Sequence, residues 1–386
     1  MQPILLKNGL MIDDKHKNTI KRDILIEGKS IKSIDEKIET DKNIFHVIEL
    51  KEKYIFPGMI DCHTHLGIIE EAAGKIGVDN NETSDPVTPH LRGIDAINPL
   101  DIAFHDAVIS GVTSIMSGPG SNNAVGGLSI AIKTHGALID KMIIRSPIGL
   151  KIALGENPIS TYGINSKAPV TRMGTASLIR ELFMRAQDYL NQKENGNIKE
   201  RDIRLEAVIP VLKNEISLRA HAHRADDIVT AIRIAEEFGI HKLVIEHGTE
   251  ANLVKEYLKE KGISVAVGPM LTPRAKMELK RRHYSTIVEL AEAGVKMALI
   301  TDHPYNLIDQ LRTVAIIAVS EGLSQMDAIK SITTNPAEIL ECADRIGKLE
   351  EGYDADIVVY DGYPLDINTK VLMTMISGEI VYQRNR

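Results

Sequence analysis

Residues 56–65 read Phe56-Pro57-Gly58-Met59-Ile60-Asp61-Cys62-His63-Thr64-His65, a short apolar run that ends in two histidines. The run predicts a buried strand. Residues two apart on a strand point to the same face, so His63 and His65 can both reach one ion. Neutral imidazoles suit zinc and similar cations. Taken alone, the pair fits either a metal site or two histidines satisfied within the core or at the surface.

Downstream of Phe56, short apolar runs alternate with segments of helical period. Thr230–Phe238 is the clearest helix, and Gly239 follows it at a position where helices commonly stop. The segments after it are predicted in this order: Lys242–Glu246 as a strand, Ala251–Lys261 as a helix, Ile263–Val267 as a strand, Thr286–Ala293 as a helix and Val295–Thr301 as a strand. Repeated strand–helix units favour a parallel sheet. Residues 56–347 slightly exceed the roughly 250 residues of a (β/α)8 TIM barrel, although the third and fourth strands, between Ala137 and Leu154, cannot be assigned.

Both ends of the chain have β character. The predicted strands are Ile4–Lys7, Asp23–Glu27 and Ile31–Ile34 near the start, and Ile357–Tyr360 and Ile380–Gln383 near the end. We therefore expect residues 1–55 and 348–386 to pair into one small sheet domain beside a barrel of residues 56–347.

Composition excludes several function classes. The 386 residues include 46 basic and 53 acidic side chains, for a net charge of −7, with 4% aromatic residues and no Trp; we expect no nucleic-acid partner. Apolar runs such as Val314–Val319 fall far short of the ~20 residues that span a bilayer, and the N-terminus lacks signal-peptide features. Two cysteines, Cys62 and Cys342, cannot make a disulfide framework. A soluble cytoplasmic protein without a membrane partner is expected.

Polar residues also close three later strands. His221 and His223 end one strand, Glu246 and His247 end the next, and Asp302 follows the last. In a barrel, the carboxyl ends of all the strands face one mouth, where active sites are built. Core packing alone would leave such groups buried without partners, so a combined metal site is predicted. His221 and His223 share a face, and either can be the ligand.

On these residues the chain resembles the amidohydrolase superfamily. The matching pieces are residues 57–65, the two later strand-end histidines, Asp302, and residues 347–359, which look like the return strand of that family. The resemblance implies a (β/α)8 barrel with a β-sandwich built from both termini, and a metal-dependent hydrolase. Within the superfamily, the chain is most similar to the imidazolonepropionase-like and dipeptidase-like branches.

The resemblance also implies roles for individual residues. His63, His65 and Asp302 would bind one ion, His221 and His247 would bind a second, and His223 would lie near the substrate. Many relatives bridge the two ions with a carboxylated lysine from the fourth strand.

Lys151 stands where that lysine is expected, and burial favours the neutral amine that carbon dioxide must attack. Glu156 is the alternative bridging ligand, and Lys151 would otherwise be a strand-end lysine reaching water. Arg224 suits a substrate carboxylate, or is a solvated residue at a helix start. One or two divalent ions are expected, with zinc first and manganese, iron, cobalt or nickel as alternatives.

The main hypothesis is hydrolysis of an amide-type C–N bond in a small molecule: a cyclic amide, an N-acyl amino acid or a dipeptide. Asp302 would move the proton from water to the leaving nitrogen, and His223 or an arginine would stabilise the oxyanion. Residues 161–165 and 268–274 are candidate pocket walls. Oligomerisation is common among such barrels, so a homo-oligomer is also considered.

Two alternatives remain. A one-metal deaminase would be expected to carry a glutamate shortly after the fifth-strand histidine, and residues 221–226 contain none. A non-catalytic scaffold would be expected to have lost ligands, and metal content separates it from both enzymes.

Overall fold

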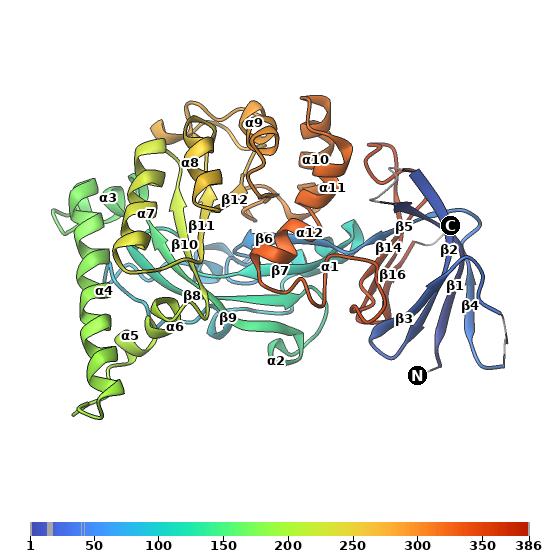
Figure 1. Cartoon of the computed structure of the whole chain (residues 1–386), viewed down its shortest axis with the longest axis horizontal. Coiled ribbons are helices and arrows are strands. Elements are labelled where there is room, and N and C mark those ends of the chain that lie inside the picture. Colours follow the sequence, from blue (N-terminus) through green and yellow to red (C-terminus); the bar gives the residue numbers. More distant parts are fainter. Residues whose placement is uncertain (1, 14–17, 40, 42, 385–386) are drawn as a thin grey trace.

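The computed structural model describes residues 2–13, 18–39, 41 and 43–384. Within them the strands form two eight-stranded sheets. Figure 1 shows one sheet at one end of the molecule, where blue N-terminal strands and red C-terminal strands lie together. The remainder of the chain forms the second sheet and the helices that surround it.

The first sheet joins the two ends of the chain. Its strands are β1 (Ile4–Asp13), β2 (Asn18–Glu27), β3 (Ser30–Asp35), β4 (His46–Glu49), β5 (Tyr54–Pro57), β14 (Ile357–Tyr360), β15 (Val371–Ile376) and β16 (Glu379–Gln383). They lie in the order β16-β15-β14-β5-β1-β2-β3, with β4 paired to β1. The link between the ends is the antiparallel pair β5 and β14, in which Tyr54 lies opposite Tyr360.

The chain passes from one sheet to the other at Gly58. Phe56 and Pro57, which the sequence places in the barrel, pair instead with β14, and the barrel begins with β6 (Met59–Thr64). A Cβ atom on Gly58 would lie 2.0 Å from Oγ1 of Thr113. Only a residue without a side chain allows this close approach to the neighbouring strand.

The second sheet is a nearly closed, TIM-like barrel. Its strands after β6 are β7 (Val112–Ser117), β8 (Val125–Lys133), β9 (Ile143–Ala153), β10 (Ser217–Ala222), β11 (Leu243–His247), β12 (Ser264–Val267) and β13 (Met297–Leu299), in sequential order. Between β13 and β6 the contact is made by backbone hydrogen bonds of the loop after β13: Asp302 N–H donates to His63 O (3.2 Å) and His65 N–H to His303 O (2.9 Å).

The barrel departs from a strict strand–helix repeat at its third strand. β8 runs antiparallel to both β7 and β9, and the described residues 118–124 connect β7 to β8 without a helix. Antiparallel strands can be joined by such a short connection, whereas parallel strands need a longer crossover. β7, β8 and β9 therefore form a β-meander. The third strand, β8, lies before the interval from Ala137 to Leu154 in which the sequence places the third and fourth strands, and only β9 falls within that interval.

Helices pack on the outside of the barrel. They are α1 (Ile102–Ser110), α2 (Ile139–Met142), α3 (Glu156–Gly163), α4 (Arg172–Glu194), α5 (Ile203–Glu206), α6 (Ile209–Leu212), α7 (Ala225–Glu237), α8 (Lys255–Glu260), α9 (Ser285–Ala293), α10 (Leu311–Ser320), α11 (Gln325–Ser331) and α12 (Thr334–Ile339). α7 buries Ile228, Ala231, Ile232 and Ala235, the spacing of one helical face. No helix in the part of the chain that the structure describes is long and apolar enough to cross a membrane.

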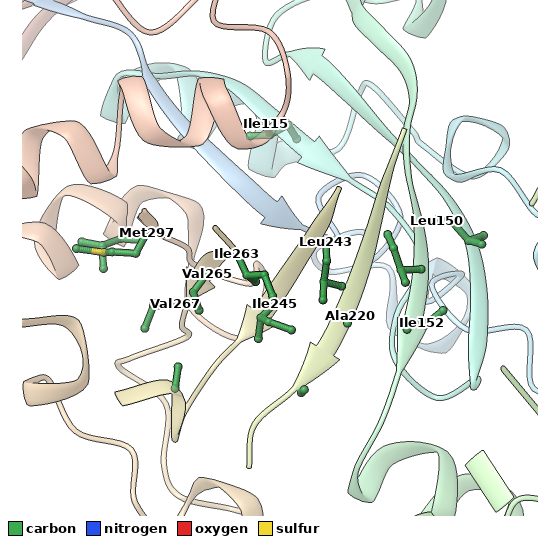
Figure 2. Packing of buried hydrophobic residues seen from close by; sticks show 14 of the residues in the cluster. Ile115, Leu150, Ile152, Ala220, Leu243, Ile245, Ile263, Val265, Val267 and Met297 are labelled. Atoms are coloured by element: carbon green, nitrogen blue, oxygen red, sulfur yellow. The ribbon is translucent and has the colours of Figure 1, made fainter. Parts of the chain in front are cut away.

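Alternation along the strands separates the outer core from the barrel interior. Leu150 and Ile152 of β9 and Leu243 and Ile245 of β11 belong to the main hydrophobic cluster, which they share with residues of the surrounding helices. Figure 2 shows these four side chains on the two strands that flank β10. Lys151 lies between the first two and therefore faces the other side of the sheet. The interior of the barrel is thus free to hold polar residues.

Candidate active site

A buried charge cluster lies inside the barrel. Oε1 of Glu246 accepts hydrogen bonds from Nε of Arg219 at 2.7 Å and lies 2.9 Å from Nδ1 of His63, while Oε2 pairs with Nζ of Lys151. Glu246 and Arg219 are 0% exposed and Lys151 is 1% exposed. Burial alone would raise the pKa of Glu246, but the surrounding positive groups hold it well below its usual value. The Glu246 carboxylate of β11 therefore connects Lys151 of β9 and Arg219 of β10 to His63, the first predicted metal ligand.

His63, His65 and Asp302 meet above this cluster. Oδ1 of Asp302 lies 3.1 Å from Nε2 of His63 and 3.5 Å from Nε2 of His65. Nδ1 of His65 donates to the carbonyl of Gly118 at 2.8 Å, which leaves its Nε2 lone pair directed at Asp302. The structure thus brings together the three residues predicted for one ion.

His247 reaches the same point through an unusual backbone conformation. Glu246 faces the interior, so simple alternation would turn His247 outward. His247 instead has φ 74°, and Asp302 has φ 55°, values that non-glycine residues adopt rarely and mostly at constrained sites. Nδ1 of His247 donates to the Gly268 carbonyl at 2.8 Å, so only its Nε2 is free to bind an ion.

His221 and His223 complete the cluster of imidazoles. Their ring centroids lie 4.8 Å apart, and the ring of His221 is 4.4 Å from that of His247. Nδ1 of His223 is 2.8 Å from Oγ1 of Thr249. Both predicted candidates therefore face the site.

Glu278 is a site residue that the sequence did not predict. Its Oε1 lies 3.8 Å from Nε2 of His221 and 3.7 Å from Nε2 of His223, and its side chain is 1% exposed. It lies in a short 3₁₀ helix, Met277–Leu279, after β12. No strand-end pattern marks this loop position, so no signal in the sequence pointed to it.

Burial keeps most of these imidazoles neutral. It lowers the pKa of His65 and of His223 to about 4, and it lowers the pKa values of His221 and His247 well below the usual value. His63 differs: burial opposes its charged form, but the Glu246 carboxylate raises its pKa. Burial alone would raise the pKa of Asp302, but its interactions with His247, His63 and His65 lower it. Neutral imidazoles and an ionised carboxylate are the forms that bind metal ions.

The donor set fits one or two divalent metal ions. Ligand atoms lie within 4.8 Å of one another in two groups, His63–His247–Asp302 and His221–His223–His247. Nε2 of His63 and Oδ1 of Asp302 are buried without a hydrogen-bond partner, although they are close together. Nδ1 of His221 and Oε1 of Glu278 are also unpartnered. Buried polar atoms of this kind are costly unless another group, such as a cation, satisfies them.

A cavity of about 430 Å³ lies over the imidazoles. His65, His221, His223, His247 and Asp302 are among its lining residues. The predicted wall at residues 268–274 contributes Pro269, Thr272 and Pro273. The other predicted wall, at residues 161–165, is absent from the described residues that line the cavity.

The remaining predicted site residues are Lys151, Glu156 and Arg224, and each of them pairs with another group of the protein. Lys151 is inside the barrel as expected, where its ammonium group pairs with Glu246. Glu156 begins α3, and its Oε2 accepts the backbone N–H of Glu278 at 3.3 Å; neither group of potential metal ligands found among the described residues includes it. Arg224 donates two hydrogen bonds to Asp226, at 2.8 and 2.9 Å. The structure does not bring Arg224 to the described lining of the cavity.

The protein has a TIM-like barrel with five histidines and an aspartate near the ends of its strands. This arrangement places it in the class of barrel hydrolases. Comparison with known proteins identifies the family. Residues 206–381 match the model of the amidohydrolase family. The chain is 43% identical to an amidohydrolase of known structure from Thermotoga maritima MSB8, over 99% of this chain and 100% of that one, with a TM-score of 0.95. The chain belongs to the amidohydrolase family.

Other relatives agree with this assignment. A dihydroorotase from Thermoanaerobacter sp. (strain X514) is 25% identical over 99% of this chain and 98% of its own length. The amidohydrolase tasK from Hapsidospora irregularis is 28% identical over 92% of this chain, and the match spans only 39% of that longer protein. The family assignment confirms the predicted enzyme class, a hydrolase that acts on carbon–nitrogen bonds.

Proposed function

We propose that the protein hydrolyses an amide-type C–N bond in a small molecule and that it needs divalent metal for this reaction. The observation that carries the proposal is the unpartnered pair of Nε2 of His63 and Oδ1 of Asp302, 3.1 Å apart near the cavity. An ion bound there supplies Lewis-acid activation of the scissile carbonyl and of the attacking water.

We assign two ions per chain, with zinc as the first choice and manganese, iron, cobalt or nickel as alternatives. His247 is common to both ligand groups, yet its Nδ1 is engaged by the Gly268 carbonyl, so it can serve one ion only. Giving His247 to the ion of His221 leaves His63, His65 and Asp302 for the other ion. Lys151, carboxylated on Nζ, is the proposed bridge, and Glu156 is not retained in that role because it pairs with the Glu278 backbone.

The protein groups then divide the work. Asp302 is ionised in its buried position, so one carboxylate oxygen accepts the proton of the attacking water and returns it to the leaving nitrogen. When Oγ1–H of Thr249 donates to Nδ1 of His223, the Nε2–H of His223 is free to donate to the developing oxyanion.

Deamination is the second candidate, and one observation favours it. The sequence lacks a glutamate just after His221, but Glu278 brings a carboxylate from a later loop to within 3.8 Å of that ring. In its acid form, a carboxyl group at this place would protonate a heterocycle. Release of ammonia distinguishes this reaction from amide cleavage.

The test begins with elemental analysis of protein purified without chelator and after reloading with zinc or manganese. We expect about two ions per chain, with hydrolysis of some members of a panel of cyclic amides, N-acyl amino acids and dipeptides. About one ion per chain, with ammonia release, would favour the deaminase, and no binding after reloading would favour the non-catalytic scaffold.

Asp302→Asn should retain much of the metal and lose ~10²–10⁴-fold in turnover. The exposed Asp344→Asn serves as the matched control. Full activity of Asp302→Asn would contradict the role given to this carboxylate.

Three broader assignments belong to the same proposal. Residues 1–55 and 348–386, together with Phe56 and Pro57 of β5, form one β-sandwich domain, and residues 58–347 form the catalytic domain. Cys62 and Cys342 are buried free thiols, which supports a reducing, cytoplasmic location. The natural partner is a small-molecule substrate, and a homo-oligomer is the assembly to test by light scattering.

A further inference from the structure

Four carboxamide side chains lie in the wall of the cavity beyond the imidazoles. Asn80, Asn81, Asn122 and Asn157 all line it. Gly120 makes this wall possible, because a Cβ atom there would lie 2.4 Å from Nδ2 of Asn81 and 2.7 Å from Nδ2 of Asn80. Side chains of this type hydrogen-bond a polar substrate but provide no charge.

Lys276 supplies the only full positive charge of Lys or Arg type among the described lining residues. Its side chain is 39% exposed. Nζ donates to Oδ1 of Asn157 at 2.5 Å and lies 3.6 Å from Oε1 of Glu278. An ammonium group has three donors, so these two neighbours leave one for a ligand in the cavity.

The position of Lys276 relative to the imidazoles restricts what it can bind. Nδ2 of Asn157 lies 3.4 Å from Nε2 of His221, and Oδ1 of the same side chain accepts from Lys276. A single carboxamide therefore separates the ammonium group from an imidazole of the proposed metal site. A substrate anion held by Lys276 must lie within a few bonds of the group that reacts at the imidazoles.

Glu278 is the carboxylate nearest to this cation, but its Oε1 lies 3.6 Å from Nζ of Lys276, beyond hydrogen-bonding distance. Its side chain is almost fully buried, and its Oε1 is shared among Lys276, His221 and His223 at 3.6–3.8 Å. Among the described residues that line the cavity, Asp302 is the only carboxylate, and it is engaged with the histidines. A carboxylate ligand in the cavity can therefore accept the donor of Nζ that Asn157 and Glu278 leave unused.

We propose that Lys276 determines specificity by binding a carboxylate on the carbon that bears the leaving nitrogen. The substrate class is then N-acyl amino acids or dipeptides with a free carboxylate, rather than neutral cyclic amides. This inference rests on the proposed amide hydrolysis and selects among the substrates that it allows.

The test compares matched pairs: N-acetyl-L-amino acids and dipeptides, each as the free acid and as the carboxamide. For the metal-loaded protein we expect kcat/KM to favour the acid by roughly 10- to 100-fold, the range for one charge-assisted hydrogen bond. Lys276→Met should remove this preference mainly by raising KM for the acids far more than for the carboxamides. Lys276→Arg should keep the preference, and Lys280→Met, an exposed lysine that lines a different pocket, should behave as wild type.

A second measurement does not depend on turnover. Calorimetric titration of metal-free protein with the same acids and carboxamides should show tighter binding of the acids in wild type and no difference in Lys276→Met. Equal use of both series by wild type, or an acid preference that survives in Lys276→Met, overturns the inference while amide hydrolysis stands. No hydrolysis of either series by metal-loaded protein overturns the proposed function, and this inference with it.

Discussion

The substitution Glu246→Gln tests the buried charge cluster beneath the ligands. Glutamine preserves the shape of Glu246 but removes its charge and replaces one acceptor oxygen with a donor. The three groups around that carboxylate are Nε of Arg219, Nδ1 of His63 and Nζ of Lys151. In the variant, either Arg219 or Lys151 loses its anionic partner and faces the NH₂ group of the new amide instead.

The magnitude follows from burial. Arg219 is 0% and Lys151 is 1% exposed, so water cannot replace the lost partner. Loss of the carboxylate charge raises the net formal charge of the cluster by one unit. Breaking a buried pair by removing one partner typically costs about 3–5 kcal/mol, because an uncompensated charge remains. We expect the free energy of unfolding to fall by that amount.

The assay is urea unfolding of metal-free protein, so that metal binding does not contribute to the measured stability. Glu237→Gln is the matched control, since Glu237 pairs with Arg180 at the surface, and such exposed pairs contribute about 1 kcal/mol or less. The double variant Lys151→Met, Glu246→Gln removes one of the stranded cations and should recover part of the loss, giving a coupling energy of ~0.5–3 kcal/mol. A change for Glu246→Gln no larger than that of Glu237→Gln would refute the reasoning.

Three further perturbations give separate outcomes. Burial raises the pKa of Tyr360 to about 12, although Arg312 opposes the shift, so the folded protein holds this proton more tightly than the unfolded chain. The free energy of unfolding should therefore fall by up to ~1.4 kcal/mol per pH unit between pH about 10 and 12. Chemical unfolding of Tyr360→Phe should show a smaller slope, and an unchanged slope would rule out Tyr360 as its origin. Gly58→Ala should lower the free energy of unfolding in urea titrations by ~1–3 kcal/mol, because the new Cβ would lie 2.0 Å from Oγ1 of Thr113. Gly163→Ala, where the nearest atom to the new Cβ is 3.6 Å away, should change it little. Similar values for the two variants would contradict the argument that Gly58 is required for the close approach to Thr113. Metal-free protein reloaded with zinc in CO₂-free buffer should show low activity that bicarbonate restores, because a carbamate on Lys151 needs carbon dioxide. Activity that does not depend on bicarbonate would mean that Lys151 remains an ammonium group paired with Glu246.

Much of the site could be predicted because it follows the strand ends. His63, His65 and His221 were identified from their places at or just after parallel strands, and a barrel brings such places to one mouth. His247 and Asp302 were identified by the same reasoning, although their backbone conformations, with φ 74° and 55°, could not be read from alternation. Their final directions depend on tertiary contacts that a strand pattern does not contain.

The loop residues could not be predicted in this way. Asn80, Lys276 and Glu278 reach the cavity or the imidazoles from connections whose paths depend on packing against other loops. β8 was missed for a related reason, since its antiparallel direction breaks the strand–helix rhythm on which the assignment relied. Arg224 was placed near the substrate by position along the chain, and its two hydrogen bonds to Asp226 hold it elsewhere.

The seam between the first and last barrel strands connects stability to the site. The contact made there by the loop after β13 is through residues of the proposed metal site, with Asp302 N–H donating to His63 O. Below it, Oδ2 of Asp61 accepts hydrogen bonds from both N–H and Oγ1–H of Thr301, at 2.9 and 2.6 Å. Because these bonds replace a regular ladder, opening the seam would separate His63 from Asp302. We therefore expect bound metal to protect the backbone amides of Thr301 and Asp302 from hydrogen exchange more than those of β15, which lies in the other sheet; equal protection would mean that the seam and the site are independent.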